Sequence, residues 1–231
     1  MYFRQIFHSP SYSISYLLAD MSACDAVVID PVADQAELLL ALLQERDLRL
    51  RYVLRTHMHS PQQGLCGELC RFTGADLVTG ADTPYEGAAL RKAHGDTVVF
   101  GSEALRVLAT PGHTPDSVCF LWRDRLFCGD TLEIGGYRAD AMQSDPGRLY
   151  DSVTQRLFLL PGETLLFPGH NFAGRTVSTV AEERHHNAAF AAGSRDSFLT
   201  ANTRQPGLPL RPEPPRHNPL TPQKNAHPEA P

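Results

Sequence analysis

Histidine and aspartate side chains follow four separate apolar, strand-like runs of this sequence. A turn reading Thr-His-Met-His-Ser follows residues 52–54, and comparable turns follow residues 105–108, 126–127 and 165–167. Imidazole and carboxylate groups on short turns at the ends of rigid strands suit a metal site, because the scaffold sets their geometry before the ion arrives. The sequence therefore predicts a metal centre assembled from four strand ends. The side chains that these turns present are His57, His59, His113, Asp130 and His170.

Two imidazoles and one carboxylate, from His57, His113 and Asp130, form the simplest ligand set among these residues. This set is the facial triad that holds non-haem iron(II) on one side and leaves about three positions for substrate and dioxygen. The same set also suits zinc in a hydrolase, so the ligand types alone leave both metals open.

The residues after His59 favour one metal ion over two. A two-metal hydrolase built on this turn would place an aspartate and a histidine there to hold a second ion, about 3.5–4 Å from the first. Those positions are occupied by Pro61 and Gln62. Proline has no donor side chain and the glutamine amide is a weak neutral ligand, so we expect one ion per chain.

The composition indicates a globular protein with a small-molecule partner. The chain has 231 residues, of which 42% are hydrophobic and 20% charged, with a net charge of −5 and a pI near 6.0. Nucleic acids and anionic membranes attract concentrated lysine and arginine, so we expect neither as a partner. No apolar stretch approaches the roughly 20 residues of a membrane span, and the first residues lack the pattern of a secretory signal. Five cysteines without framework spacing complete the prediction of a cytoplasmic protein with reduced thiols.

Hydrophobic periodicity predicts two groups of strands with helices between and outside them. This order favours an α/β protein layered as helix, sheet, sheet and helix, an αββα sandwich. We assign residues 1–204 to one catalytic domain. Residues 205–231, where proline is dense, are predicted to be a tail without regular structure that is partly disordered. The expected strands lie within residues 1–20, 26–29, 52–54, 77–78, 98–100, 105–109, 118–122, 126–127 and 164–167, and the expected helices near residues 34–46, 64–72, 145–160 and 176–191.

Four motifs carry a resemblance to a known family. They read Thr-His-x-His, Thr-Pro-Gly-His-Thr-Pro, Gly-Asp-Thr-Leu and Pro-Gly-His, in this order. Over about residues 1–187 the chain resembles the metallo-β-lactamase superfamily, whose fold is an αββα sandwich. Within that superfamily the chain is most similar to the persulfide dioxygenases. The segments that carry this closer similarity are residues 3–7, 16–20, 29–32, 138–140, 149–153, 176–180 and 182–184.

The resemblance implies a metal site and an activity. Persulfide dioxygenases bind a single iron(II) through the residues that correspond to His57, His113 and Asp130. They oxidise a persulfide, typically glutathione persulfide, with dioxygen to sulfite and a thiol. They do not use as ligands the two positions that Pro61 and Gln62 occupy here, so these residues disfavour a two-metal glyoxalase II and leave an iron site intact. Members of the family often form dimers, which makes a homodimer the expectation for this chain.

Further residues are expected around the metal. His59 and His170 are the candidate catalytic residues, placed to hydrogen-bond the metal-bound water or oxygen species rather than to ligate the metal. Arg138, Asp140 and Phe172 are the candidate substrate-binding residues. An internal salt bridge between Arg138 and Asp140 is the alternative role for that pair.

Departures from the family pattern concern the thiol carrier. Phe172 stands where the family has a tyrosine, residues 187–189 read Asn-Ala-Ala instead of Asn-Pro-Arg, and the proline-rich tail lacks the family's closing segment. These changes remove polar or cationic groups from where glutathione would lie, so a smaller persulfide, a polysulfide or a protein persulfide stays open as the substrate. Two other functions also stay open: a single-zinc hydrolase of a thioester, like glyoxalase II, and a binding protein without catalysis.

Overall fold

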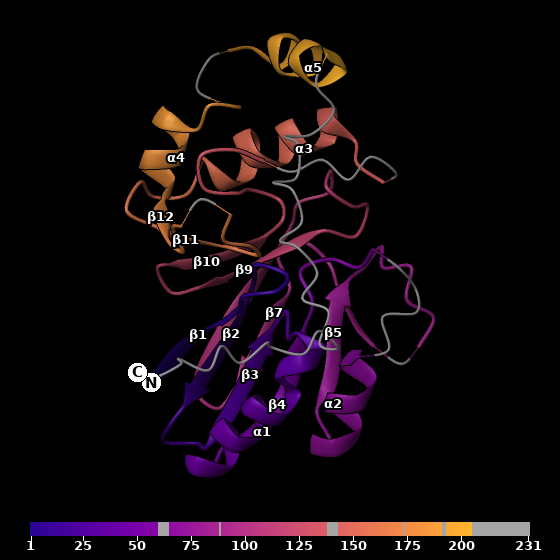
Figure 1. The fold of residues 1–231 in the computed structure, drawn as a ribbon, viewed down its shortest axis with the longest axis vertical. Helices are drawn as coiled ribbons and strands as arrows, with labels where there is room; N and C mark the ends of the chain where they lie inside the picture. Colours follow the sequence, from indigo (N-terminus) through magenta and orange to yellow (C-terminus); the bar gives the residue numbers. More distant parts are fainter. Residues whose placement is uncertain (60–64, 88, 138–142, 173, 191–192, 205–231) are drawn as a thin grey trace, which may run out of the picture.

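The structure, a computed structural model, describes residues 1–59, 65–87, 89–137, 143–172, 174–190 and 193–204. Two six-stranded sheets form its centre (Figure 1). The first sheet contains, in spatial order, β1 (Tyr2–His8), β2 (Ser13–Asp20), β3 (Asp25–Ile29), β4 (Arg49–Leu54), β5 (Asp76–Gly80) and β6 (Leu90–Lys92). The second contains β12 (Ser178–Thr179), β11 (Leu165–Pro168), β10 (Arg125–Gly129), β9 (Val118–Trp122), β8 (Glu103–Ala109) and β7 (Thr97–Phe100).

Strand direction changes within each sheet. β1, β2 and β3 pair antiparallel, whereas β3 to β6 run parallel to one another. In the second sheet β7 to β10 pair antiparallel, and β11 runs parallel to β10. Parallel neighbours end at the same edge of a sheet. The turns that follow β10 and β11 therefore lie side by side.

Alternate side chains of the strands divide between an inner core and two outer cores, as expected of a pleated strand. Along β2, Tyr16 and Leu18 pack between the sheets, whereas Leu17 packs in the cluster that α1 and α2 also join. α1 (Ala36–Glu45), after a short 3-10 turn, and α2 (Leu65–Thr73) cover the outer face of the first sheet.

Three helices cover the outer face of the second sheet. They are α3 (Pro146–Ser152), α4 (Val180–His186) and α5 (Arg195–Arg204), and α3 continues into a π-helical turn, Val153–Leu157. Their apolar residues share a third cluster with side chains of β8 to β11. The order of layers in Figure 1 confirms the αββα sandwich.

Most predicted elements are present, with three differences. The helix predicted over residues 145–160 begins as expected, because the Asp145 side chain accepts a hydrogen bond from Arg148 N at 3.0 Å. The helix predicted over residues 176–191 is wrong in its extent, since β12 takes residues 178–179 and α4 ends at His186. The sequence analysis also predicts neither β6, an edge strand of 3 residues, nor the helix α5 (Arg195–Arg204).

Cys24, Cys119 and Cys128 are free thiols. Burial raises the pKa of the Cys119 thiol to about 12 and that of Cys128 well above its usual value. Both stay protonated and pack as small apolar residues.

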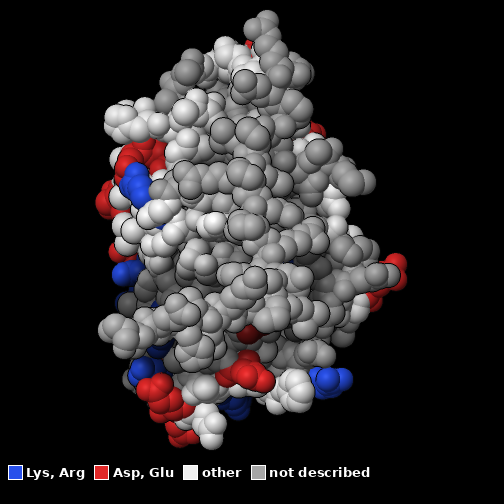
Figure 2. Space-filling view, in the orientation of Figure 1, with Lys and Arg blue, Asp and Glu red and all other residues white. Residues whose placement is uncertain are grey.

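The remaining features of the fold are the C-terminal tail, the apolarity of the helices and the charge of the surface. The division into a domain of residues 1–204 and a tail of residues 205–231 stays a prediction, because the tail lies outside the described residues. Within the described ranges, no helix combines the length and the apolarity that crossing a bilayer requires. Figure 2 shows acidic and basic side chains mixed along the visible margins of the molecule.

Candidate metal centre

Four side chains from three turns meet at one end of the two sheets. His57 and His59 follow β4, His113 lies in the turn between β8 and β9, and Asp130 follows β10. One donor atom of each lies within 4.8 Å of the donor atoms of the others. We call these four residues the donor cluster.

The distances within the donor cluster fit a single ion. His59 Nε2 lies 3.1 Å from His57 Nε2 and 3.4 Å from His113 Nε2. Asp130 Oδ2 lies 3.8 Å from His57 Nε2 and 3.6 Å from His113 Nε2. Ligand atoms bound about 2.0–2.2 Å from one cation are separated by roughly 3–3.5 Å, so a small shift of the carboxylate completes the set. Imidazoles and a carboxylate are donors that both iron(II) and zinc accept.

A chain of hydrogen bonds sets the tautomer of His57. Thr56 Oγ1 donates its single hydrogen to Asp30 Oδ2 at 2.6 Å, and Thr56 N donates to Asp30 Oδ1 at 2.9 Å. The same hydroxyl oxygen lies 3.0 Å from His57 Nδ1, so it accepts the Nδ1–H hydrogen. The lone pair of His57 Nε2 is then left to face the other donors. Outer contacts of this kind orient a ligating histidine and raise its basicity.

Two glycines leave the space that this arrangement needs. Gly129 has a φ of +51°, and a Cβ there would lie 2.3 Å from Thr56 Oγ1. A Cβ on Gly169 would lie 2.5 Å from Asp130 Oδ1. The glycines of the Gly-Asp and Pro-Gly-His motifs are therefore required by the close approach of the turns to one another.

The Asp130 carboxylate is buried and charged. Its Oδ1 accepts a hydrogen bond from His170 Nδ1 at 2.7 Å, which leaves Oδ2 for the donor cluster. Burial by itself raises the pKa of this carboxyl, but the imidazoles of His170, His57 and His113 outweigh burial and hold the pKa well below its usual range. Burial also holds the pKa of the His57 imidazole well below its usual value. Both groups are thus in the protonation states that ligate metals.

Helix α3 fixes the turn that presents His113. Ser152 Oγ donates to Pro111 O at 2.7 Å, and Asp145 N donates to Gly112 O at 2.7 Å. Gly112 has a φ of +145°, and a Cβ there would lie 2.3 Å from the helix backbone. The helix therefore lies directly against the turn, and the buried His113 ring has a fixed direction of approach.

An aromatic wall made of Tyr12, Phe172 and His170 borders the site. The rings of His170 and Phe172 stack with their centroids 5.2 Å apart and their planes 16° apart. The Tyr12 ring centroid lies 5.5 Å from that of Phe172. Asn171 N donates to Tyr12 O at 2.8 Å, so the β1–β2 hairpin and the turn after β11 are joined at this point. The wall reaches the donor cluster through the bond from His170 to Asp130.

Of the remaining predicted residues, the structure places some at the donor cluster, and others lie outside the described ranges. His59, expected beside the metal, has its Nε2 inside the donor cluster. His170 reaches the cluster through Asp130. Arg138 and Asp140 lie outside the described residues, as do the two positions after Ser60 that favoured a single ion.

Asp30 and Thr56 both support His57, although neither was predicted to have a role. Asp30 ends a buried strand and Thr56 directly precedes a predicted ligand, which is the available signal. Their contact depends on the parallel register of β3 and β4, in which Ile29 lies opposite Leu54. A pairing between two strands of this kind is not visible in either stretch of sequence alone.

Comparison with known proteins identifies the family. The sequence profile of the metallo-beta-lactamase superfamily matches residues 10–170. The chain belongs to this superfamily. Within it, persulfide dioxygenase ETHE1, mitochondrial, from Homo sapiens is 40% identical over 190 residues, which cover 80% of this chain and 74% of that protein. A hydroxyacylglutathione hydrolase from Nitrosococcus oceani is 33% identical over 194 residues, which cover 81% and 73%.

A solved structure points to the same branch of the superfamily. The crystal structure of ETHE1 from Myxococcus xanthus superposes with a TM-score of 0.85 at 41% identity, covering 90% of this chain and 92% of that one. Both comparisons with ETHE1 proteins exceed the similarity to the hydrolase. This metallo-β-lactamase superfamily protein is therefore a member of the persulfide dioxygenase branch.

Proposed function

We propose that this protein is an iron(II)-dependent persulfide dioxygenase. One persulfide, one dioxygen and one water give one thiol, one sulfite and two protons, with the terminal sulfur oxidised and dioxygen reduced. The observation that supports this function is the buried set of two imidazoles and one carboxylate, His57, His113 and Asp130, in a chain of the persulfide dioxygenase branch.

We assign the metal to Nε2 of His57, Nε2 of His113 and Oδ2 of Asp130, with one ion per chain. When bound, iron(II) supplies open coordination positions and the electrons that make dioxygen reactive toward a sulfur anion. The protein's own contribution is orientation, because Thr56 directs the His57 ring and His170 directs the Asp130 carboxylate. Zinc is the alternative ion for the same donors.

His59 and His170 take different parts in the proposed reaction. His59 is the most exposed member of the donor cluster, so we assign it to exchange a proton at Nε2 with the substrate or a water on the open side. His170 donates its Nδ1 hydrogen to Asp130 Oδ1 and thereby keeps Oδ2 directed at the donor cluster. Its part in catalysis is then to hold the carboxylate in place.

The aromatic wall supports a role for Phe172 in binding the substrate. Phe172 carries no hydrogen-bond donor on its ring, so it presents an apolar face beside His170 that favours the methylene next to a persulfide sulfur. Tyr12 contributes a phenol group to this wall. Arg138 and Asp140 stay predictions as partners for charged groups of the thiol carrier, which is glutathione or a related small thiol.

The decisive experiment combines metal analysis with an oxygen electrode. Protein purified without added metal is expected to hold about one iron per chain and to consume one dioxygen per glutathione persulfide, with sulfite as product. The variant His113→Ala is expected to lose iron and oxygen uptake together. His185→Ala, which changes an exposed histidine on α4, is the matched control and is expected to keep both.

A hydrolase is the second candidate, favoured by the 33% identity to a hydroxyacylglutathione hydrolase and by the position of His59 in the donor cluster. Bound zinc, turnover of a thioester and no demand for oxygen would select it. Absence of turnover with either metal would select a binding protein without catalysis. We also retain as proposals a homodimer and a cytoplasmic location, which analytical ultracentrifugation and cell fractionation test.

A further inference from the structure

A cavity of about 250 Å³ adjoins the turn that carries His113, and its lining contains none of the four residues of the donor cluster. We call it the cationic cavity. Lys92 at the end of β6 and His94 just beyond it line one part. Arg148 on α3 and Arg156 on the π-helical turn line another. Positive side chains from separate elements thus converge on one hollow.

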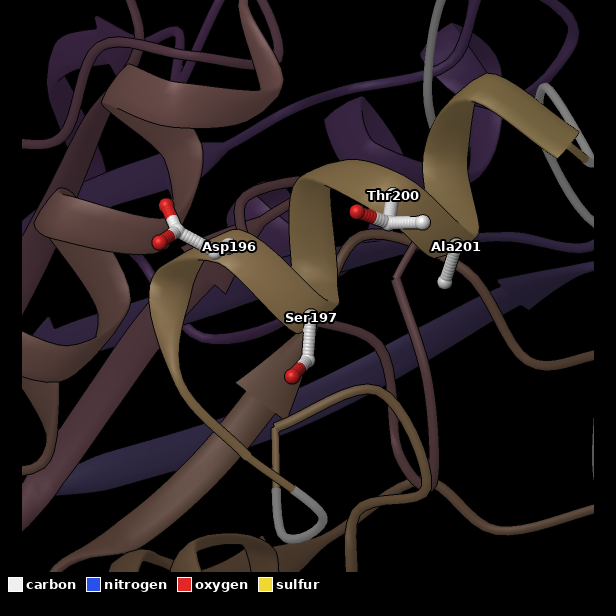
Figure 3. A pocket seen from close by; sticks show the side chains of 4 residues that line it. All are labelled: Asp196, Ser197, Thr200 and Ala201. Atoms are coloured by element: carbon white, nitrogen blue, oxygen red, sulfur yellow. The ribbon is translucent and has the colours of Figure 1, made fainter.

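A hollow beside α5 provides a contrast. The described residues that line it, Asp196, Ser197, Thr200 and Ala201, come from that one helix (Figure 3). Among the described residues, this lining comes from a single element and includes no lysine or arginine. The cationic cavity differs on both points.

Two of the cavity's cations form no ion pair with a described residue. Among the residues that the structure describes, no hydrogen bond or ion pair reaches the side chains of Lys92 and Arg148. Lys92 is half-buried as a residue, and Arg148 is exposed. An ammonium or guanidinium group without a paired carboxylate is a favourable partner for a bound anion.

Arg156 and His94 are held in place by one residue, Ala109. The Arg156 guanidinium donates to Ala109 O, and Ala109 N donates to His94 Nδ1 at 3.3 Å. With Nδ1 acting as an acceptor, the neutral imidazole carries its hydrogen on Nε2 and keeps a donor to offer. Partial burial, Arg156 and Arg106 all lower the pKa of His94, which agrees with a concentration of positive charge here.

Asp82 and Asp116 also line the cavity and reduce its positive charge without cancelling it. Asp82 is exposed. Asp116 is buried, its Oδ1 accepts a hydrogen bond from Thr114 Oγ1 at 2.7 Å, and burial raises the pKa of its carboxyl. Three permanently charged side chains face two carboxyls, so an excess of positive charge remains when all of them are ionised.

We propose that the cationic cavity binds a small oxyanion of sulfur or phosphorus, held by Lys92, Arg148 and Arg156 with His94 as a neutral donor. Ammonium and guanidinium groups form their strongest hydrogen bonds with such anions, because charge assists each bond. A water molecule occupies about 30 Å³ of liquid, so the cavity has room for one oxyanion with part of its hydration shell. Sulfite, sulfate and phosphate share this chemistry.

Isothermal titration of the metal-loaded protein with sodium sulfite, sulfate and phosphate tests the proposal. Chloride keeps the ionic strength constant, because screening would otherwise imitate a charge effect. We expect one site per chain. Lys92→Gln and Arg148→Gln, which alter different elements, are each expected to weaken binding about five- to tenfold.

Two further variants make the test specific to the cavity. Arg4→Gln removes an equal charge from an exposed position of β1, at the opposite edge of the first sheet from β6, and is expected to leave binding unchanged. Asp82→Asn removes a negative charge from the lining and is expected to tighten binding about two- to threefold. Thermal unfolding of each variant without anion checks that the fold is intact.

The comparison of anions identifies the source of the ligand. Tighter binding of sulfite than of phosphate would support a site for the product of the proposed reaction, and equal binding would support a general oxyanion site. Binding that Lys92→Gln and Arg148→Gln leave intact would belong to the metal centre and would overturn the proposal. Failure of all three anions to bind would overturn it as well, without bearing on the oxygen-electrode result.

Discussion

The donor cluster and the cationic cavity share the turn of residues 110–117, yet they are built in opposite ways. In the donor cluster, the Thr56 hydroxyl orients His57 and the His170 imidazole orients Asp130. Such ligands need no reordering when the ion binds.

The cationic cavity lacks this support. Within the described part of the chain, Lys92 and Arg148 have no hydrogen-bond partner for their charged groups, so a ligand must order them as it binds. Folding therefore orients the ligands of the donor cluster in advance, whereas in the cavity the binding of the anion must also offset the cost of ordering the side chains. We therefore expect large effects from changes in the donor cluster and small ones from changes in the cavity.

The largest effect is expected from Gly129→Ala. A Cβ at this position would lie 2.3 Å from Thr56 Oγ1, and the residue has a φ of +51°. Overpacking and backbone strain together are expected to lower the free energy of unfolding by about 3 kcal/mol, measured by urea denaturation, and to release the metal. Gly135→Ala is the matched control, because its φ is +77° but a Cβ there meets nothing within 4 Å. Equal losses in both variants would show that strain alone is responsible.

The second effect concerns the hydroxyl that orients His57. Thr56→Val keeps the shape of the side chain but removes the acceptor of the Nδ1 hydrogen, so His57 loses its fixed tautomer. Losing such an outer contact is expected to weaken metal binding about 10- to 100-fold, measured by competition with a chelator. Thr56→Ser keeps the hydroxyl and is expected to restore most of the affinity. An unaltered affinity in Thr56→Val would remove the hydrogen-bond chain from the explanation.

The donor cluster could largely be predicted from sequence, whereas its supports and the cavity could not. His57, His113 and Asp130 each end an apolar run in a recognisable turn motif, so local pattern finds them. The bond between Thr56 and Asp30 depends on the register of two strands that lie apart in sequence.

The cationic cavity and two edge strands lack a local signal altogether. In the sequence, strands β7 to β10 lie between Lys92 and Arg148. Only the folded chain brings both residues to the lining of one cavity. β6 has only 3 residues and β12 only 2, too few for a period to be recognised. β12 also begins with Ser178 inside a stretch whose sequence predicts a helix. Its extended conformation depends on its pairing with β11, which the local sequence does not show.

A third effect separates the buried imidazole from exposed ones. The folded pKa of His57 lies below its unfolded value of about 6.5, so the unfolded chain binds the extra proton and stability falls as pH drops below that value. In metal-free protein this group is expected to contribute up to about 1.4 kcal/mol per pH unit. Urea denaturation between pH 7.5 and 5.5 measures the slope, which His57→Asn is expected to reduce. His185→Asn, at an exposed position, should leave the slope as it is, and an identical slope in all three proteins would contradict the assignment.

The smallest effect tests whether the two regions communicate through their shared turn. An oxyanion bound between Lys92 and Arg148 would restrain the turn that carries His113. The reason is that Asp145, the N-cap residue of α3, already donates a backbone hydrogen bond to Gly112 O in this turn. Saturating sulfate is expected to raise the affinity for cobalt(II), read from its absorbance, about two- to fivefold at constant ionic strength, and by reciprocity the metal should tighten sulfate equally. Lys92→Gln should abolish this coupling while leaving affinity without sulfate unchanged. A coupling of the same size in Lys92→Gln would mean that sulfate acts at the metal itself, and the turn would then connect the two regions in structure but not in binding.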